Sequence, residues 1–558
     1  MEMRGERVGV GDGGAGGVGL RPLDLVVFVL TCALFAGARL WRLDASCLWF
    51  DEIFSVHAAA HDWRGLLDFV ALDLIHPPLF YLLLKLWITV VGGESVWWLR
   101  LFPALTAAAA VVPFLLLCRE LRLRRDARRF AFLLMAADGF LIQHAQELRM
   151  YSLLLLFAAC SLWLFVRFAD GDAPRRGDAL ALFAVNLLLV YTHYFGWLLV
   201  ALELVFLIVR RRRRSKLFAA TVAALVVCYS PWLWLVWRAA GAGGGGLDQN
   251  LGWAVRPRPL DIFQPFLMLH EPFRFRRNTH EPVVLRVNVV LAALLFAPAL
   301  AALCWRAFVG KPDEGREAAT GDGLNLRRGA GLRYTTLRLL FFATAPVVVT
   351  FLLAQILPQS VWGVRHLIII APAYLPLAAL AVVSARPAWL AIAIKILLAC
   401  WLLLAGTVWL MRRDEPPIWC AWETLAWRAA ESEKAGAGEV ENAGGVKIYA
   451  TEDLVAYHMW YALRSFGGER VRVAVVKGLP GIVEDKAFFL PRGFPEVSVM
   501  DADAAFAEER FWLAFRDADW NESHPLLQML SARGYEIAER FEVAASGQKA
   551  FIVSLRRR

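Results

Sequence analysis

Long apolar stretches recur along most of the 558-residue chain, and they constrain its fold more than any other feature. A helix needs about 20 predominantly apolar residues to cross the hydrocarbon layer of a membrane. Several stretches between Leu23 and Leu410 reach or nearly reach that length. The chain is 59% hydrophobic, too apolar for a soluble protein of this size. The pattern predicts a multi-pass α-helical membrane domain over residues 23–410 and a soluble domain over residues 411–558.

Clusters of arginine in short loops indicate how the apolar segments are threaded. Lys and Arg mark cytoplasmic loops, and residues 119–129 and 210–216 are strongly basic. Placing these loops inside gives about eleven spans, a flexible cytoplasmic tail over residues 1–22 and an extracytoplasmic soluble domain. Residues 79–91 are short for a span and include Lys85, so we expect an interfacial helix there. The net charge of +10 is thereby explained by topology, and no nucleic-acid partner is expected.

This threading brings the polar residues that topology does not explain to the outer side. Ionisable groups in or near membrane segments are costly, so they are candidates for function. A collection of acids, histidines and arginines on one side indicates an active site that faces outward. The set comprises Asp51, Glu52, His76, Gln146, Glu147, Arg149, His193 and Arg365.

Five motifs in order carry a resemblance to a known family. They are WFDEIFS (49–55), HPPLFYLLLKLW (76–87), QELRMYSLLLLF (146–157), YTHYFG (191–196) and VRHLIIIAPAY (364–374). Together they resemble the bacterial branch of the GT-C glycosyltransferases. This branch is similar to the dolichyl-phosphate-mannose protein mannosyltransferases and the lipid A aminoarabinose transferases, glycosyltransferase families 39 and 83. The resemblance covers about residues 23–384. It implies a bacterial inner-membrane enzyme, surrounded by membrane lipids, that moves a sugar from a polyprenyl-phosphate donor to a glycan, lipid or protein acceptor outside.

Asp51 and Glu52 suit the chemistry of such a transfer. Glycosyl transfer with inversion needs a carboxylate that takes the proton of the acceptor as its oxygen attacks the anomeric carbon. The leaving group is a phosphate, which needs cations rather than an acid. We assign Asp51 as the base, with Glu52 orienting it or binding the acceptor. The alternative is a solvated acidic pair at a helix start.

Cations near the outer ends of the spans are candidates for binding the donor phosphate. Arg149 and Arg365 offer planar forks of donors, although interfacial anchoring is the alternative for both. The aminoarabinose transferases have a Lys-Pro pair that contacts phosphate at a place comparable to His76-Pro77. A histidine there needs a raised pKa to be cationic, and the alternative for His76 is a helix cap, since proline is ordinary at a helix start. Lys85 is a further candidate for binding the phosphate. The alternative is that its side chain only extends to place the amine at the membrane interface.

Four more residues are candidates for substrate binding: Glu147, Tyr151, His193 and Tyr194. The alternatives are pairing with Arg149 for Glu147 and an aromatic belt for His193 and Tyr194. No cofactor is expected, while dependence on a divalent metal is left open. Of eight cysteines, Cys47 and Cys420 fall in segments predicted to lie outside, where a disulfide is an option.

The soluble domain alternates strand and helix patterns, which predicts a small α/β domain. Strands are expected at VKIYA, VRVAVV, KAFFL, FWLAF and KAFIVSL, and helices at DLVAYHMWYALRSF and HPLLQMLSARG. It carries no dinucleotide-binding, metal-binding or nucleophile motif, so docking or acceptor positioning is expected.

Two other functions compete with the transferase hypothesis. A flippase or transporter of lipid-linked sugars would need polar residues near mid-membrane and repeated halves, and the sequence shows few of the former and no obvious repeat. A non-catalytic membrane scaffold would leave the Asp51-Glu52 pair unexplained.

Overall fold

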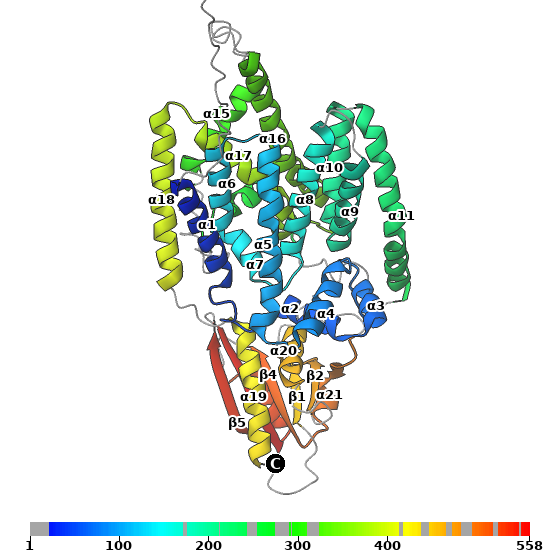
Figure 1. The fold of residues 1–558 in the computed structure, drawn as a ribbon. Helices are drawn as coiled ribbons and strands as arrows, with labels where there is room; N and C mark the ends of the chain where they lie inside the picture. Colours follow the sequence, from blue (N-terminus) through cyan, green and yellow to red (C-terminus); the bar gives the residue numbers. More distant parts are fainter. Residues whose placement is uncertain are drawn as a thin grey trace, which may run out of the picture.

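The computed structural model consists of a helical domain and a C-terminal sheet domain stacked end to end (Figure 1). The residues that the structure describes are 22–170, 176–210, 212–242, 254–273, 290–291, 293–309, 323–411, 417–436, 446–464, 471–480, 494–516, 523–545 and 548–558. The expected tail over residues 1–22 lies outside the described residues except for Pro22. The expected strand at KAFFL lies wholly outside them.

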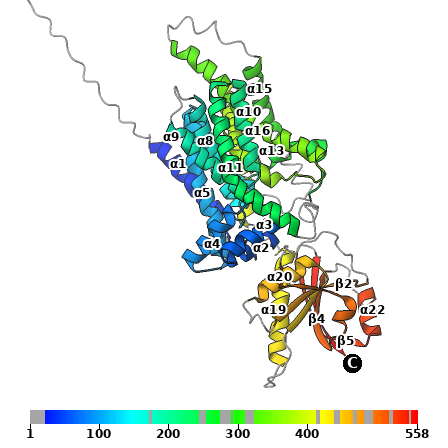
Figure 2. The ribbon, with the colours of Figure 1, turned by 90° about the vertical axis from the view of Figure 1, so that its right-hand side faces the viewer.

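Long helices run side by side through the helical domain (Figures 1 and 2). The long helices and the shorter ones between them are α1 (Pro22–Leu40), α5 (Val96–Glu120), α6 (Arg125–Ala137), α7 (Gly139–Ala145), α8 (Tyr151–Asp170), α9 (Arg176–Thr192), α10 (Phe195–Arg210), α11 (Arg212–Ala242), α15 (Ala297–Phe308), α16 (Gly323–Ile356), α17 (Ala371–Val383) and α18 (Ala388–Met411). Short helices η1 (Pro259–Phe263) and α13 (Gln264–Met268) follow α11, and η2 (Val364–Ile370) precedes α17.

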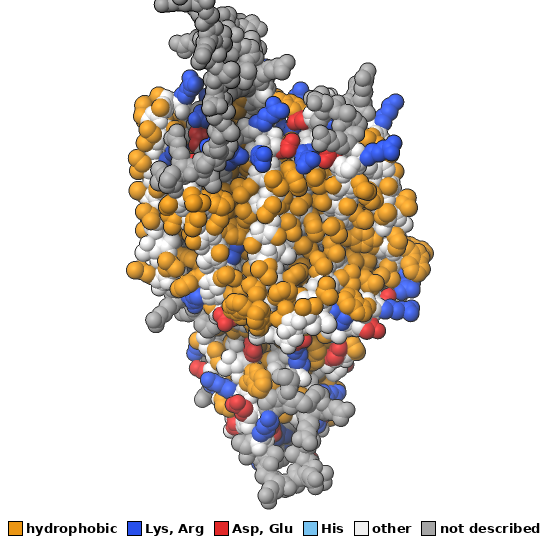
Figure 3. Space-filling view, viewed as in Figure 1, with side chains coloured by type: hydrophobic (Ala, Val, Ile, Leu, Met, Phe, Trp, Pro, Cys, Tyr) orange, Lys and Arg blue, Asp and Glu red, His pale blue; other side chains and the backbone are white. Residues whose placement is uncertain are grey.

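The apolar character of this domain fits a membrane protein. Among the described residues, six helices are long and apolar enough to cross a membrane. Several others, such as α6 and α15, are too short to meet that measure, so the expected count of eleven spans is not confirmed. Figure 3 shows a broad band of hydrophobic side chains across the visible face of the domain, with Lys and Arg gathered beyond the edge of the band. Such a band is what hydrocarbon contact requires.

A layer of three short helices lies across the end of the bundle, beside the C-terminal domain (Figures 1 and 2). They are α2 (Phe50–Ala60), α3 (Trp63–Asp73) and α4 (Leu79–Val91). Asp62 caps α3 by accepting a hydrogen bond from the backbone N–H of Gly65, and α3 ends where Leu74 adopts a left-handed φ of 65°. This reversal turns the following residues back toward α2. The 13-residue α4 is shorter than the roughly 20 residues that a membrane span needs, as the predicted interfacial helix should be.

The C-terminal domain is a six-stranded mixed sheet with the order β3-β2-β1-β4-β6-β5. The pairs β3-β2, β2-β1 and β1-β4 are parallel, whereas β4-β6 and β6-β5 are antiparallel. Its elements are α19 (Ile418–Gly436), β1 (Val446–Ala450), α20 (Asp453–Leu463), β2 (Val471–Lys477), β3 (Ser498–Asp501), α21 (Ala502–Ala505), β4 (Arg510–Arg516), α22 (Pro525–Ala532), β5 (Tyr535–Ala545) and β6 (Gln548–Arg557). The expected α/β domain is therefore present, with four of the five expected strands found as β1, β2, β4 and β6.

Covalent and aromatic contacts join the two domains. Cys47, which precedes α2, forms a disulfide with Cys420 of α19, with a Cα–Cα distance of 5.6 Å. The rings of Phe50 on α2 and Tyr457 on α20 meet edge to face at 5.3 Å. The sheet domain thus packs directly on the helix that carries Asp51 and Glu52.

Candidate active site

The first turn of α2 holds two adjacent carboxylates in different surroundings. Successive residues of a helix point about 100° apart, so Asp51 and Glu52 face different neighbours. Glu52 is fully buried. Its carboxylate accepts two hydrogen bonds from Arg100, at 2.9 and 2.7 Å. It also accepts the backbone N–H groups of Trp49, at 3.1 Å, and Leu148, at 2.8 Å. With four donors in place, Glu52 is arranged to fix the site rather than to receive a substrate.

Asp51 lies beside two guanidinium groups and remains partly open. Its side chain is 18% exposed. Oδ2 is 3.4 Å from Nη1 of Arg365 and 3.8 Å from Nε of Arg149. Arg365 comes from η2 and is itself 27% exposed, while Arg149 is buried in the turn between α7 and α8. The structure therefore brings together the predicted base and both predicted arginine ligands of the phosphate.

Arg149 is held in place by groups from three elements. Nη1 donates to the backbone carbonyl of Asp51, at 3.1 Å, and lies 3.3 Å from the hydroxyl of Tyr81 on α4. Nη2 lies 3.2 Å from Nε2 of His76, in the turn between α3 and α4. Nε is buried and has no hydrogen-bond partner among the described residues. This N–H is the part of Arg149 that remains available beside Asp51.

His76 serves Arg149 rather than acting as a cation. Its Nδ1 lies 2.6 Å from the carboxylate of Asp73, to which it donates, so Nε2 is left to accept from Arg149. Burial and the nearby charge of Arg149 hold the pKa of His76 well below its usual value. The imidazole is therefore neutral at pH 7, which argues against a cationic role, and contact of His76 with the phosphate stays a prediction. The low-dielectric site and two arginines disfavour a positive charge there.

A ring of aromatic side chains lies beside the arginines. Tyr151 begins α8, and its ring centre lies 5.9 Å from the guanidinium carbon of Arg365. The Tyr151 hydroxyl is buried without a hydrogen-bond partner among the described residues. The His193 ring lies 6.1 Å from that of His76 and 4.8 Å from that of His366. Burial, with the fields of His76 and the arginines, lowers the pKa of His193 far below its usual value.

Two of the predicted residues, Tyr194 and Glu147, make contacts of their own around this cluster. The hydroxyl of Tyr194 donates to the backbone carbonyl of Leu74 at 3.3 Å, and burial raises its pKa to about 12. Glu147 is buried against His144, whose Nδ1 lies 2.8 Å away. Burial alone would raise the pKa of Glu147, but the hydrogen bond from His144 and the nearby arginines outweigh it and lower the pKa.

Lys85 of α4 lies beside the C-terminal end of α2, whereas Asp51 is in the first turn of that helix. Its amine donates to the backbone carbonyls of Ala59 and His61, so it caps the C-terminal end of that helix. Ala59 is eight residues after Asp51, a rise of about 12 Å. The structure therefore separates Lys85 from the Asp51 cluster. Tyr81, four residues earlier on the same face of α4, takes the place beside Arg149.

Sequence reasoning missed several residues that build the site. Arg100 and Asp73 lie outside the five motifs and act through contacts made by folding, whereas Tyr81 lies within the motif at residues 76–87 but was not singled out there. His366 follows Arg365 directly, and its buried Nδ1 has no hydrogen-bond partner among the described residues. No group of three or more His, Cys, Asp or Glu side chains suited to a metal ion occurs within the described parts of the chain.

Comparison with solved structures identifies the fold. No protein-family model and no curated protein matches the sequence. The structure of ArnT from Cupriavidus metallidurans in the apo state matches with a TM-score of 0.54 at 15% identity, over 95% of this chain and 97% of that one. The chain has the GT-C fold. ArnT bound to undecaprenyl phosphate gives a TM-score of 0.55 at 15% identity, over 95% of this chain and 98% of that one. The archaeal oligosaccharyltransferase AglB from Archaeoglobus fulgidus is also similar, at 13% identity, covering 78% of this chain and 63% of that one, with a TM-score of only 0.41. At such identities the likeness establishes the GT-C fold and not the reaction.

Proposed function

We propose that this protein transfers a sugar, a hexose or a pentose, from a polyprenyl-phosphate donor to an acceptor on the extracytoplasmic face of a bacterial inner membrane. The acceptor is a glycan, a lipid or a protein. The observation that carries the proposal is the partly exposed carboxylate of Asp51 between two guanidinium groups, at 3.4 and 3.8 Å, within a GT-C fold.

The charges of this cluster suit a phosphate-bearing donor. Arg149 and Arg365 place two guanidinium groups beside the carboxylate of Asp51, while the carboxylates of Asp73 and Glu147 are hydrogen-bonded to His76 and His144. A guanidinium fork matches the geometry of phosphate oxygens, so the two arginines offer the donors that a phosphate needs. ArnT, which has the same fold, has been captured with undecaprenyl phosphate. A lipid donor also accounts for a site at the end of a membrane domain, because its isoprenoid tail stays in the bilayer.

The reaction follows from these roles. The acceptor hydroxyl gives its proton to the carboxylate of Asp51 while its oxygen forms a bond to the anomeric carbon of the donor. The bond between that carbon and the phosphate oxygen breaks, and polyprenyl phosphate leaves with the electron pair. Attack opposite the leaving group inverts the anomeric configuration. Arg365 and Arg149 stabilise the charge that develops on the phosphate.

Glu52 and His76 act through their neighbours in this scheme. Glu52, fixed by Arg100, holds the first turn of α2 and with it Asp51. His76 and Tyr81 orient the Arg149 guanidinium. We assign Tyr151 and His193 to the wall around the sugar, because the Tyr151 ring lies 5.9 Å from the guanidinium carbon of Arg365 and the His193 ring lies beside that of His76.

Conversion of a labelled polyprenyl-phosphate sugar by the purified protein in vesicles tests the proposal. Wild type should release polyprenyl phosphate when acceptor lipids or glycans from the same cells are added, whereas Asp51→Asn should not. Asp503→Asn, at an exposed position of the C-terminal domain, serves as the control and should keep full activity. Movement of the intact donor across the vesicle membrane without any transfer would support the flippase alternative instead.

A further inference from the structure

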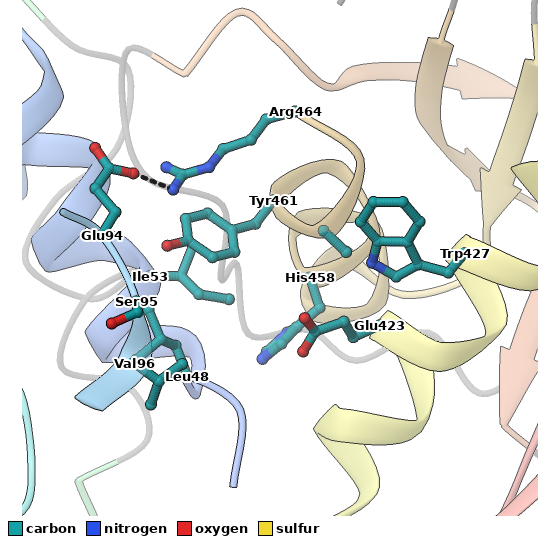
Figure 4. A pocket seen from close by; sticks show the side chains of 11 residues that line it. Leu48, Ile53, Glu94, Ser95, Val96, Glu423, Trp427, His458, Tyr461 and Arg464 are labelled. Carbon is teal, nitrogen blue, oxygen red and sulfur yellow. Dashed lines mark hydrogen bonds and ion pairs between the residues drawn. The ribbon is translucent and has the colours of Figure 1, made fainter. Parts of the chain in front are cut away.

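A cavity of about 240 Å³ lies between the two domains, apart from the Asp51 cluster. It is bounded by the segment before α5, the start of α2, and helices α19 and α20 of the C-terminal domain (Figure 4). Ile53 lines it from α2, two residues after Asp51. Two residues correspond to about 200° around a helix, so the cavity and the reaction centre lie on opposite sides of α2.

The cavity presents buried groups that need a hydrogen-bond donor. His458 of α20 donates Nδ1–H to the backbone carbonyl of Leu454 at 2.9 Å. Nε2 of its neutral ring is therefore a bare acceptor, and it is buried without a hydrogen-bond partner among the described residues. Burial lowers the pKa of His458 to about 4, which keeps the ring neutral at pH 7. A buried acceptor left unpaired is costly, so a ligand that donates to it gains stability.

Glu423 of α19 adds a second acceptor to the same cavity. Its carboxylate makes no hydrogen bond or ion pair within the described parts of the chain, and burial raises its pKa. The charges opposite it are already balanced, because Glu94 forms an ion pair with Arg464 at the cavity edge (Figure 4). The polar wall is therefore not built to hold an anion.

Aromatic side chains complete the lining. Figure 4 shows Tyr461 reaching in from α20 and Trp427 from α19. Sugar rings combine hydroxyl donors with an apolar face, and aromatic side chains with adjacent polar groups match both properties. The cavity is smaller than the roughly 300–1,000 Å³ of pockets for drug-sized ligands, which suits one ring rather than several.

We propose that this cavity is a second saccharide subsite, which holds one neutral sugar ring of a glycan acceptor through His458 and Glu423 while another part of that glycan reacts at Asp51. The assignment of the ring to the acceptor rests on the proposed transferase function. The subsite gives the C-terminal domain a role, because two of its helices supply the groups that bind.

Saturation-transfer NMR on the full-length protein in detergent tests the subsite. The probes are the methyl glycosides of glucose, galactose, mannose and N-acetylglucosamine, with tetramethylammonium as the comparison for a cationic ligand. At least one glycoside should receive saturation from wild type. Glu423→Gln should lower the apparent affinity roughly two- to tenfold, as expected for one weakened hydrogen bond. Glu431→Gln, which alters an exposed carboxylate on the same helix, is the matched control and should bind as wild type does.

Further variants distinguish glycoside binding in the cavity from the proposed transfer reaction at Asp51. Asp51→Asn should bind the glycoside normally, because its side chain lies on the other side of α2. A protein that binds the glycosides but transfers no sugar would refute the proposed function and leave the subsite standing as a saccharide site. His458→Phe fills the cavity and should abolish the signal while the protein elutes as a folded species. The subsite is wrong if no glycoside binds, if Glu423→Gln and His458→Phe bind as wild type does, or if tetramethylammonium alone receives saturation.

Discussion

Replacing Glu52 by alanine should destabilise the protein far more than replacing its neighbour Asp51 by asparagine. Glu52 is fully buried and shares two hydrogen bonds of 2.7 and 2.9 Å with Arg100, which is also buried. Removing one partner of a buried ion pair costs about 3–5 kcal/mol, because the other charge stays buried without compensation. The remaining contacts of Arg100 with the backbone carbonyls of Ser46 and Cys47 place the cost toward the lower end.

The midpoint of thermal unfolding in detergent, taken at one scan rate, measures this difference. A fixed rate matters because large membrane proteins often unfold irreversibly. Glu52→Ala should unfold at a clearly lower temperature than wild type, while Asp51→Asn should stay close to it. Arg100→Ala should be lowered as well, and the double variant should lose less than the sum of the two single changes. Equal midpoints for the Glu52 and Asp51 variants, or strict additivity, would refute the division of roles within the pair.

The site makes three further predictions. Arg365→Ala should lower the catalytic efficiency with the donor by about ten- to a hundredfold, as expected for loss of a charge-assisted contact, with acceptor saturation unchanged; equal effects on both substrates would contradict a phosphate role. The pKa of His76 is lowered in the folded state, so stability is present above its unfolded value of about 6.5 and is lost as the pH falls below it. Unfolding midpoints at pH 7.5 and pH 5 should therefore differ less in His76→Gln than in wild type, and an unchanged difference would contradict the assignment. Arg64→Cys and Arg124→Cys place thiols at side chains that are 88% and 77% exposed; an impermeant thiol reagent should label the first and not the second in spheroplasts, and the reverse would overturn the orientation.

The helical domain and part of the site were accessible from the sequence. Apolar stretches of span length predict the long helices because lipid leaves the backbone no other partners. Asp51, Arg149 and Arg365 lie far apart in the chain, yet both arginines come within 4 Å of Asp51, as the prediction that all three share one side of the membrane requires. The number of spans was not accessible, because helices such as α6 and α15 are too short to distinguish spanning from partial insertion by composition.

Residues that act through tertiary contacts were not accessible. Nothing in the sequence around Arg100 indicates that its guanidinium reaches Glu52, 48 positions earlier. His76 was considered as a cation. In the structure its Nδ1 donates to Asp73, so Nε2 carries no proton and accepts from Arg149. Strand β5 was missed because it lies at the edge of the sheet, and its mostly exposed, charged sequence lacks the apolar pattern of the inner strands.

Transfer from a lipid-linked sugar by the purified protein tests the central claim most directly. The measurement follows the release of polyprenyl phosphate from a polyprenyl-phosphate sugar in vesicles that contain cellular acceptors, for wild type and Asp51→Asn. Wild type should release it with formation of a glycosylated product, and Asp51→Asn should be slower by about 10²–10⁴-fold, the contribution of a general base. Asp51→Asn activity within a few-fold of wild type would contradict the assignment of the base. Intact donor with wild type under the same conditions would contradict the proposed reaction itself.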